Sequence, residues 1–102
     1  MKEKIMTLEQ AASLVRNGDL LAMTVAIIEN APMAFLREIV RKGIRNLRLA
    51  TLPGGGLNAD FLIGAGSVAA YETCHCSLGP MGPAPNFQRA LRDQRIHLMD
   101  NT

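Results

Sequence analysis

The sequence predicts an α/β fold with a mainly parallel sheet and helices on both faces of that sheet. Short apolar runs alternate with helical patterns, at intervals of roughly 25 residues that are typical of repeated β-α units. The run from Asp19 to Ala26 is almost uniformly apolar, as expected of a strand covered on both faces. No change of composition or linker interrupts the pattern, so residues 1–102 are expected to form a single domain.

The N-terminal part predicts a helix, a strand and a second helix. Thr7 and Gln10 have the spacing of a capping box, and Asn17-Gly18 supplies a stop signal for the helix that follows Thr7. The apolar run 19–26 is the first strand. Pro32 suits a first helical turn, and the apolar residues of the next helix fall on one face: Phe35, Leu36, Ile39 and Val40, with Gly43 at the end.

The same unit then repeats through the rest of the chain. The pattern predicts strands at Leu47–Leu52, Ala69–Cys76 and Ile96–Met99, and helices at Ala59–Ala65 and Asn86–Asp93. The crossovers between parallel strands are expected to be right-handed.

The strand-to-helix loops of such a series lie at one edge of the sheet. These loops are Thr24–Ala31, Pro53–Leu57 and Ser77–Pro85, and all are rich in small residues or proline. The loops at the opposite edge, Lys42–Arg45 and Arg92–Arg95, are charged. This asymmetry places the expected binding surface at the small-residue edge.

Three consecutive glycines, Gly54, Gly55 and Gly56, are the strongest local signal of a site. They follow an apolar run, precede a helical pattern, and allow backbone N–H groups to approach an anionic ligand. A flexible turn is an equally good reading of the glycines taken alone. The segment lacks both the GxGxxG spacing and the Lys-Ser/Thr of a P-loop, so dinucleotide and triphosphate sites are disfavoured.

Other residues with reactive side chains give no catalytic set. In Cys74-His75-Cys76, strand alternation puts the cysteines on one face and the histidine on the other, so no metal site is expected and both cysteines are interpreted as small buried residues. Glu29 is interpreted as a solvated loop acid. Asp60 is interpreted as a carboxylate that complements the dipole of its own helix. No nucleophile, base and orienting acid can be assembled from these residues.

Composition narrows the classes of partner. Hydrophobic residues make up 48% of the chain and the formal net charge is +2, so neither disorder nor nucleic-acid binding is expected. No apolar run reaches the ~20 residues of a membrane-spanning helix. A signal peptide is not evident, and we expect a cytoplasmic protein with reduced cysteines.

A longer ordered string of motifs resembles a known family. It comprises Asn17-Gly18-Asp19, Pro32-Met33-Ala34, the segment GGGLNADFLIGAGSV from Gly54 to Val68, and Gly82, Pro85 and Phe87 with Arg89-Ala90. From about Thr7 onwards the chain resembles the alpha (A) subunit of family I CoA-transferases, of the glutaconate/3-oxoacid type. The resemblance implies a CoA-transferase type of α/β fold.

The resemblance also implies a function. In this family a glutamate of a beta subunit attacks an acyl-CoA thioester, and CoA then passes to a second carboxylate, while the alpha subunit lines the CoA and acyl pocket. The chain would thus contain no catalytic residue, hold no permanent cofactor, and need a beta-type partner with acyl-CoA and carboxylate substrates. The matching pocket positions are Thr24, Val25, Ala26, Asn30, Gly54, Gly55, Gly56, Gly79 and Gly82.

Two departures from the family pattern bear on this expectation. The family has Gly-Gly-Phe where this chain has Thr24-Val25-Ala26, and a glycine where it has Asn30; β-branched residues there would narrow the CoA site. Family alpha subunits are also longer, so the chain resembles a truncated, N-terminal portion that is inactive alone. With the strand order 3-2-1-4 that we expect, Ile96–Met99 would be an open edge through which the chain self-associates.

Two other functions fit the same sequence. One is a non-catalytic remnant or binding module that keeps the fold while residues 24–26 block CoA. The other is a relative of the sugar-phosphate isomerases that share this sheet, with Gly54–Gly56 holding a phosphate.

Overall fold

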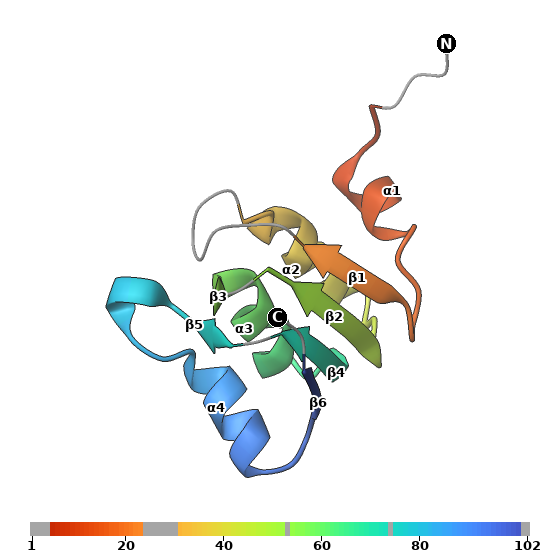
Figure 1. Ribbon diagram of the computed structural model, residues 1–102. Helices are drawn as coiled ribbons and strands as arrows, with labels where there is room; N and C mark the ends of the chain where they lie inside the picture. Colours follow the sequence, from red (N-terminus) through yellow and green to blue (C-terminus); the bar gives the residue numbers. More distant parts are fainter. Residues whose placement is uncertain (1–4, 24–30, 53, 74, 101–102) are drawn as a thin grey trace.

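Helices and strands alternate along the chain as the α/β pattern predicts (Figure 1). The computed structural model describes residues 5–23, 31–52, 54–73 and 75–100. The elements are α1 (Leu8–Ala12), β1 (Leu20–Met23), α2 (Met33–Arg41), β2 (Leu47–Thr51), β3 (Gly54–Gly55), α3 (Gly56–Gly64), β4 (Val68–Thr73), β5 (Cys76–Ser77), the 3-10 helix η1 (Gly79–Met81), α4 (Pro85–Arg92) and β6 (His97–Asp100). In these described ranges, no helix has the length and apolar character needed to cross a membrane.

The main sheet is parallel throughout and has the strand order β1-β2-β4-β6. The parallel α/β class is therefore confirmed, but the expected order 3-2-1-4 is wrong. The last strand pairs with β4, where Tyr71 aligns with Leu98, rather than with β1. When crossovers of one hand all proceed in the same direction across the sheet, each new strand is added beside the previous one. The strand order in the sheet then follows the order in the chain. As predicted, the last strand is at an edge of the sheet.

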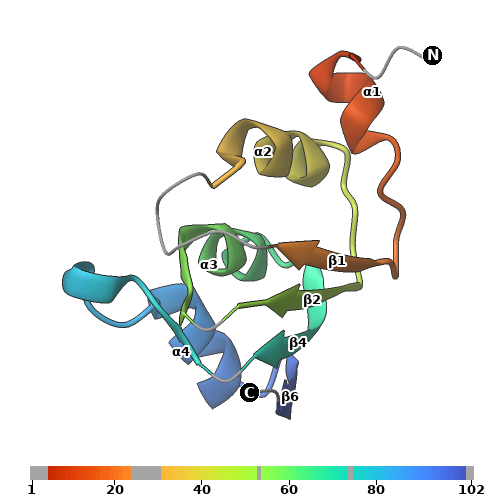
Figure 2. The same cartoon turned by 45° about the horizontal axis from the view of Figure 1, so that its top comes forward.

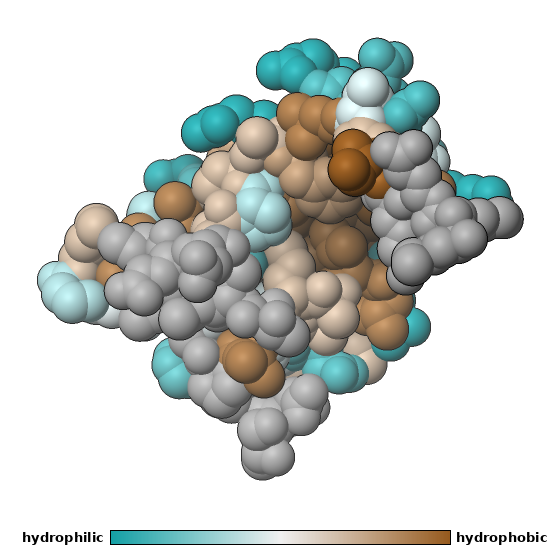
Figure 3. Space-filling model, turned by 90° about the horizontal axis from the view of Figure 1, so that it is seen from above, coloured by the Kyte–Doolittle hydropathy of each residue, from teal (hydrophilic) through white to brown (hydrophobic). Residues whose placement is uncertain are grey.

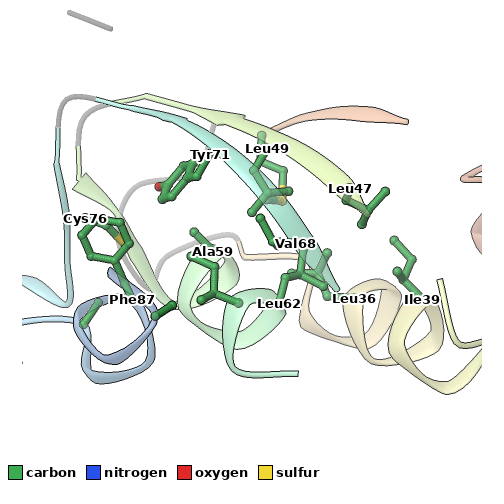
Figure 4. Packing of buried hydrophobic residues seen from close by; sticks show 14 of the residues in the cluster. Leu36, Ile39, Leu47, Leu49, Ala59, Leu62, Val68, Tyr71, Cys76 and Phe87 are labelled. Atoms are coloured by element: carbon green, nitrogen blue, oxygen red, sulfur yellow. The ribbon is translucent and has the colours of Figure 1, made fainter. Parts of the chain in front are cut away.

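This strand order also puts α2, α3 and α4 on the same face of the sheet (Figures 2 and 4). Helices were expected on both faces, whereas the helices of the described residues cover one. On the other face Leu20, Arg48, Ala70 and His97 lie side by side across the strands, and Leu20 is 60% exposed. Figure 3 shows brown, apolar surface over the region of β1. The uniform hydrophobicity of the first strand therefore does not mean burial on both faces.

The core lies between the covered face of the sheet and the three helices (Figure 4). Leu47, Leu49 and Tyr71 from the strands are fully buried, as are Leu36 and Ile39 from the predicted apolar face of α2. Tyr71 also meets the ring of Phe87 of α4 in an edge-to-face arrangement, with ring centroids 5.7 Å apart.

The ends of several elements differ from the expected ones. The capping box is confirmed, since Thr7 Oγ1 accepts the N–H of Gln10 at 3.1 Å and Gln10 Oε1 accepts that of Thr7 at 2.9 Å. Helix α3 begins at Gly56 rather than near Ala59, so the last glycine of the triplet opens the helix, with a φ of 81°. The expected strand 69–76 is divided into β4 and the separate short strand β5.

At the sheet edge opposite the candidate site, hydrogen bonds of Arg45 connect neighbouring turns. Asn17 Oδ1 accepts the backbone N–H of Arg45 at 2.8 Å, and the N–H of Gly18 donates to the carbonyl of Arg45 at 3.1 Å. The Arg45 guanidinium donates to the carbonyl of Gly66 at 3.4 Å. The Asn17-Gly18 part of the family motif therefore joins the turns at the edge remote from the expected ligand.

Candidate functional site

Two of the predicted ligand-edge loops are joined by backbone pairing. Strands β3 and β5 form a separate parallel pair in which Gly54 aligns with Cys76 and Gly55 with Ser77. The glycine segment and the loop that starts at Ser77 therefore lie together beyond the ends of β2 and β4, as Figure 1 shows. The residues predicted for the third loop, Thr24, Val25, Ala26, Glu29 and Asn30, all lie outside the described residues.

Gly55 has a backbone conformation that excludes other residue types. Its φ of 54° and ψ of −63° are near those of a γ-turn with a positive central φ. A Cβ built on Gly55 would overlap the hydroxyl of Tyr71 and lie 3.0 Å from the Sγ of Cys76. The N–H of Gly55 donates to the carbonyl of Leu52 at 3.2 Å. The absence of a side chain at Gly55 is thus required by the interior of the protein, which differs from the expected reason of ligand access.

Tyr71 occupies the space that Gly55 leaves free. The Tyr71 side chain is fully buried, and its hydroxyl oxygen lies 2.7 Å from Thr51 Oγ1 in a hydrogen bond. Burial raises the pKa of Tyr71 well above its ordinary value, and the hydrogen bond from Thr51 offsets only part of that rise. The phenol is therefore neutral at physiological pH.

Cys76 is the second reactive group beside the glycine segment. It is buried and its thiol is free. Burial raises the pKa of Cys76, although a hydrogen bond from Tyr71 and another from the backbone of Gly56 act in the opposite direction. His75 is exposed, and Cys74 lies outside the described residues. Cys76 therefore behaves as the small buried residue that was predicted, and the described ranges contain no group of metal-binding side chains.

The loop after β5 folds into a compact turn. The N–H of Leu78 donates to the carbonyl of Gly82 at 2.8 Å, and the N–H of Gly82 donates to that of Gly79 at 2.9 Å. Gly82 has a φ of 101° and no heavy atom near its missing Cβ, so its conformation rather than crowding requires glycine. At this edge Leu52 and Met81 expose apolar side chains to solvent.

Asp60 and Asn58 are buried polar residues whose positions the sequence did not predict. Asp60 accepts the backbone N–H of Phe87 at 2.8 Å and the amide of Asn86 at 3.1 Å. Its charge therefore complements the start of α4, not the dipole of its own helix. Asn58 is fully buried near the end of β1, with its amide nitrogen 3.5 Å from Met23 Sδ. Both side chains hold α3 against its neighbours directly behind the glycine segment.

Comparison with curated proteins identifies a relative. The A subunit of glutaconate CoA-transferase from Acidaminococcus fermentans is 40% identical to this chain over 73 residues. The chain is similar in sequence to part of this CoA-transferase A subunit. The aligned residues are 71% of this chain and 22% of the A. fermentans subunit, so the chain spans a small part of that protein. No family model matches the sequence.

Solved structures give the same result for the fold. The crystal structure of the A. fermentans glutaconate CoA-transferase superposes with a TM-score of 0.81 at 28% identity, over 98% of this chain and 32% of that one. The decarboxylase AibA/AibB superposes with a TM-score of 0.83 at 29% identity, over 95% of this chain and 38% of that one. The CoA-transferase type of fold is therefore confirmed.

Proposed function

We propose that this chain lines part of the coenzyme A and acyl pocket of a CoA-transferase, whose catalytic glutamate lies on a separate beta-type subunit. The reaction would move CoA between an acyl-CoA and a carboxylic acid, in the cytoplasm and without a permanently bound cofactor. The observation that carries the proposal is the pairing of β3 with β5, which joins the glycine segment to the next loop at the carboxyl edge of the sheet. A ligand site is expected at this edge of a parallel sheet.

The chemistry of the described residues fits a pocket wall. The thiol of Cys76 and the phenol of Tyr71 are both buried with raised pKa values, so neither is an ionised nucleophile at neutral pH. We propose that Gly54, Gly55, Gly56, Gly79 and Gly82 line the pocket, together with Thr24, Val25, Ala26 and Asn30 of the first loop. The chain alone would be inactive.

Reconstitution with a beta-type CoA-transferase subunit tests this proposal. We expect the two chains to co-purify, CoA to raise the melting temperature of the assembly, and CoA transfer to depend on the beta subunit. An assembly that forms but is not stabilised by CoA would favour the non-catalytic binding module instead. Stabilisation by a phosphosugar but not by CoA would favour the relationship to sugar-phosphate isomerases.

Decarboxylation is a second candidate reaction, favoured by the structural similarity to the decarboxylase AibA/AibB. The two reactions leave different products, since decarboxylation releases CO2 whereas CoA transfer converts one thioester to a carboxylate and one carboxylate to a thioester without releasing CO2. The same reconstituted assembly should therefore be assayed for both products. Release of CO2 without exchange of CoA between acids would select decarboxylation.

We also propose that the isolated chain self-associates. Among the described residues β6 pairs with β4 alone, and Leu98 is 40% exposed at this edge of the sheet. Unpaired strand edges favour association with another chain. Sedimentation at tens of micromolar should show a dimer or larger species, and a clean monomer would contradict this proposal.

A further inference from the structure

We infer that Tyr71 is a positioning residue: its buried hydroxyl holds the backbone of the glycine segment Gly54–Gly56 in one conformation. The structural part of this inference stands on the contacts below. Its consequence for the ligand rests on the proposed function, that the same segment lines a CoA pocket.

The first step concerns the fit between Gly55 and the hydroxyl. The hydroxyl of Tyr71 fills the place where any other residue at position 55 would put its Cβ. The backbone of Gly55 can therefore lie directly against the phenol. Its dihedral angles, with a positive φ, are readily adopted by glycine and unfavourable for other residue types. Because a glycine has many other conformations open to it, surrounding contacts must select this one.

The second step concerns what holds the phenol in place. Thr51, four residues before Gly55, bonds to the hydroxyl at 2.7 Å, and Phe87 of α4 meets the Tyr71 ring at 85° between ring planes. The labelled rings of Tyr71 and Phe87 and the side chain of Cys76 are seen together in Figure 4. Because Tyr71 is fully buried on β4, the central part of the sheet fixes its position.

The third step links Tyr71 to both loops of the candidate site. Cys76, which pairs with Gly54 in the β3–β5 ladder, also has its thiol beside the Tyr71 hydroxyl and the backbone of Gly56. Loss of the hydroxyl would leave a gap beneath Gly55 and remove a hydrogen bond from Thr51. The glycine segment should then sample other conformations while the sheet and α2 keep theirs.

Hydrogen exchange of the glycine amides measures this effect directly. The Tyr71→Phe variant keeps the ring and removes the hydroxyl, whereas Thr51→Val keeps the hydroxyl and removes its partner. Ser13→Ala is the matched control, because it removes a hydroxyl that bonds at 2.9 Å to Glu9 on the remote helix α1. We expect the amides of Gly55 and Gly56 to exchange roughly fivefold faster in Tyr71→Phe, as for loss of one net hydrogen bond, with amides of β1 and α2 unchanged. Thr51→Val should give a smaller change at the same amides.

The same samples separate this inference from the proposed function. Free CoA is the probe: Tyr71→Phe should weaken its binding to the assembly with a beta-type subunit by a similar factor, and Ser13→Ala should not. If the wild-type assembly does not bind CoA, the proposed function fails while the exchange rates of the chain still decide the role of Tyr71. Equal exchange at Gly55 and Gly56 in wild type and Tyr71→Phe would overturn the inference. If Tyr71→Phe does not fold, unchanged exchange in Thr51→Val would overturn it.

Discussion

The carboxylate of Asp60 accepts the backbone N–H of Phe87 at 2.8 Å, so a side chain of α3 caps the first turn of α4. Helix α4 has no cap from its own N-cap residue, Ala84. Asn86 strengthens the contact by donating its amide to the other carboxylate oxygen at 3.1 Å. This junction holds the start of α4 in place, and with it Phe87, whose ring packs against Tyr71.

Removing the carboxylate should loosen that junction. We expect Asp60→Ala to lower the free energy of unfolding by about 2 kcal/mol, the upper range for loss of a helix cap. Asp93→Ala is the control, since Asp93 is exposed and its contact with Arg95 is a surface ion pair at 3.7 Å. Urea unfolding measures both variants, and equal small effects would contradict the capping role of Asp60.

The space next to Gly64 provides a second test of the same junction. A Cβ at Gly64 would lie 2.5 Å from the amide nitrogen of Asn86 and 2.6 Å from its Cγ. Gly64→Ala should therefore displace Asn86 and destabilise the protein by about 1 kcal/mol, even though alanine favours helices. In an Asn86→Ala background the same change should become stabilising. An equal effect of Gly64→Ala in both backgrounds would show that Asn86 does not cause the cost.

Substitution of Gly55 tests the fit against Tyr71. Gly55→Ala places a Cβ against the Tyr71 hydroxyl and also puts a non-glycine residue at a positive φ. It should lower the free energy of unfolding by about 3 kcal/mol or more. Gly43→Ala separates the two terms, because Gly43 has a φ of 74° but no heavy atom near its missing Cβ. This control should lower the free energy of unfolding by about 1 kcal/mol. Equal losses in urea unfolding would mean that the Tyr71 hydroxyl imposes no constraint.

The buried thiol of Cys76 predicts how the stability of the fold depends on pH. Burial raises the pKa of Cys76 above its ordinary value, so the folded chain retains a proton that the unfolded chain releases. Its contribution to the free energy of unfolding is complete below about pH 8.5, the pKa of an unperturbed thiol, and declines as the pH rises through the higher folded-state value. Urea unfolding between pH 7 and pH 10 should show this decline, and Cys76→Ala should reduce it. An unchanged slope in Cys76→Ala would contradict the assignment.

Local patterns predicted the elements of the fold well. The capping box at Thr7, the apolar face of α2 and the parallel alternation all follow from short-range spacing, and the structure confirms them. The strand order was not predictable in this way, since the neighbour of β6 is set by the path of the crossovers and not by the residues of the strand. The same limit explains Leu20, whose apolar neighbours gave no sign that one face of β1 is exposed.

The proximity of two predicted ligand-edge loops was predictable, but their detailed contacts were not. The parallel pattern predicted that the glycine triplet and the loop from Ser77 lie at one edge of the sheet, and the β3–β5 pairing confirms that these two loops lie together. The reason for glycine at position 55 depends on Tyr71, which is 16 residues away and reaches the turn only through the folded sheet. The role of Asp60 likewise depends on a partner 27 residues away. Contacts of this kind have no local pattern in the sequence.

The glycines of the chain offer the most direct test of the central proposal, that CoA binds at the edge formed by the two paired loops. Gly54, Gly55, Gly56, Gly79 and Gly82 belong to that edge, whereas Gly18, Gly43 and Gly66 belong to turns that precede β1, β2 and β4 at the opposite edge. With the 15N-glycine-labelled chain assembled with a beta-type subunit, titration with CoA should shift the NMR signals of the first group and leave those of the second unchanged. No shift at saturating CoA, or shifts at Gly18, Gly43 and Gly66 instead, would contradict the proposal.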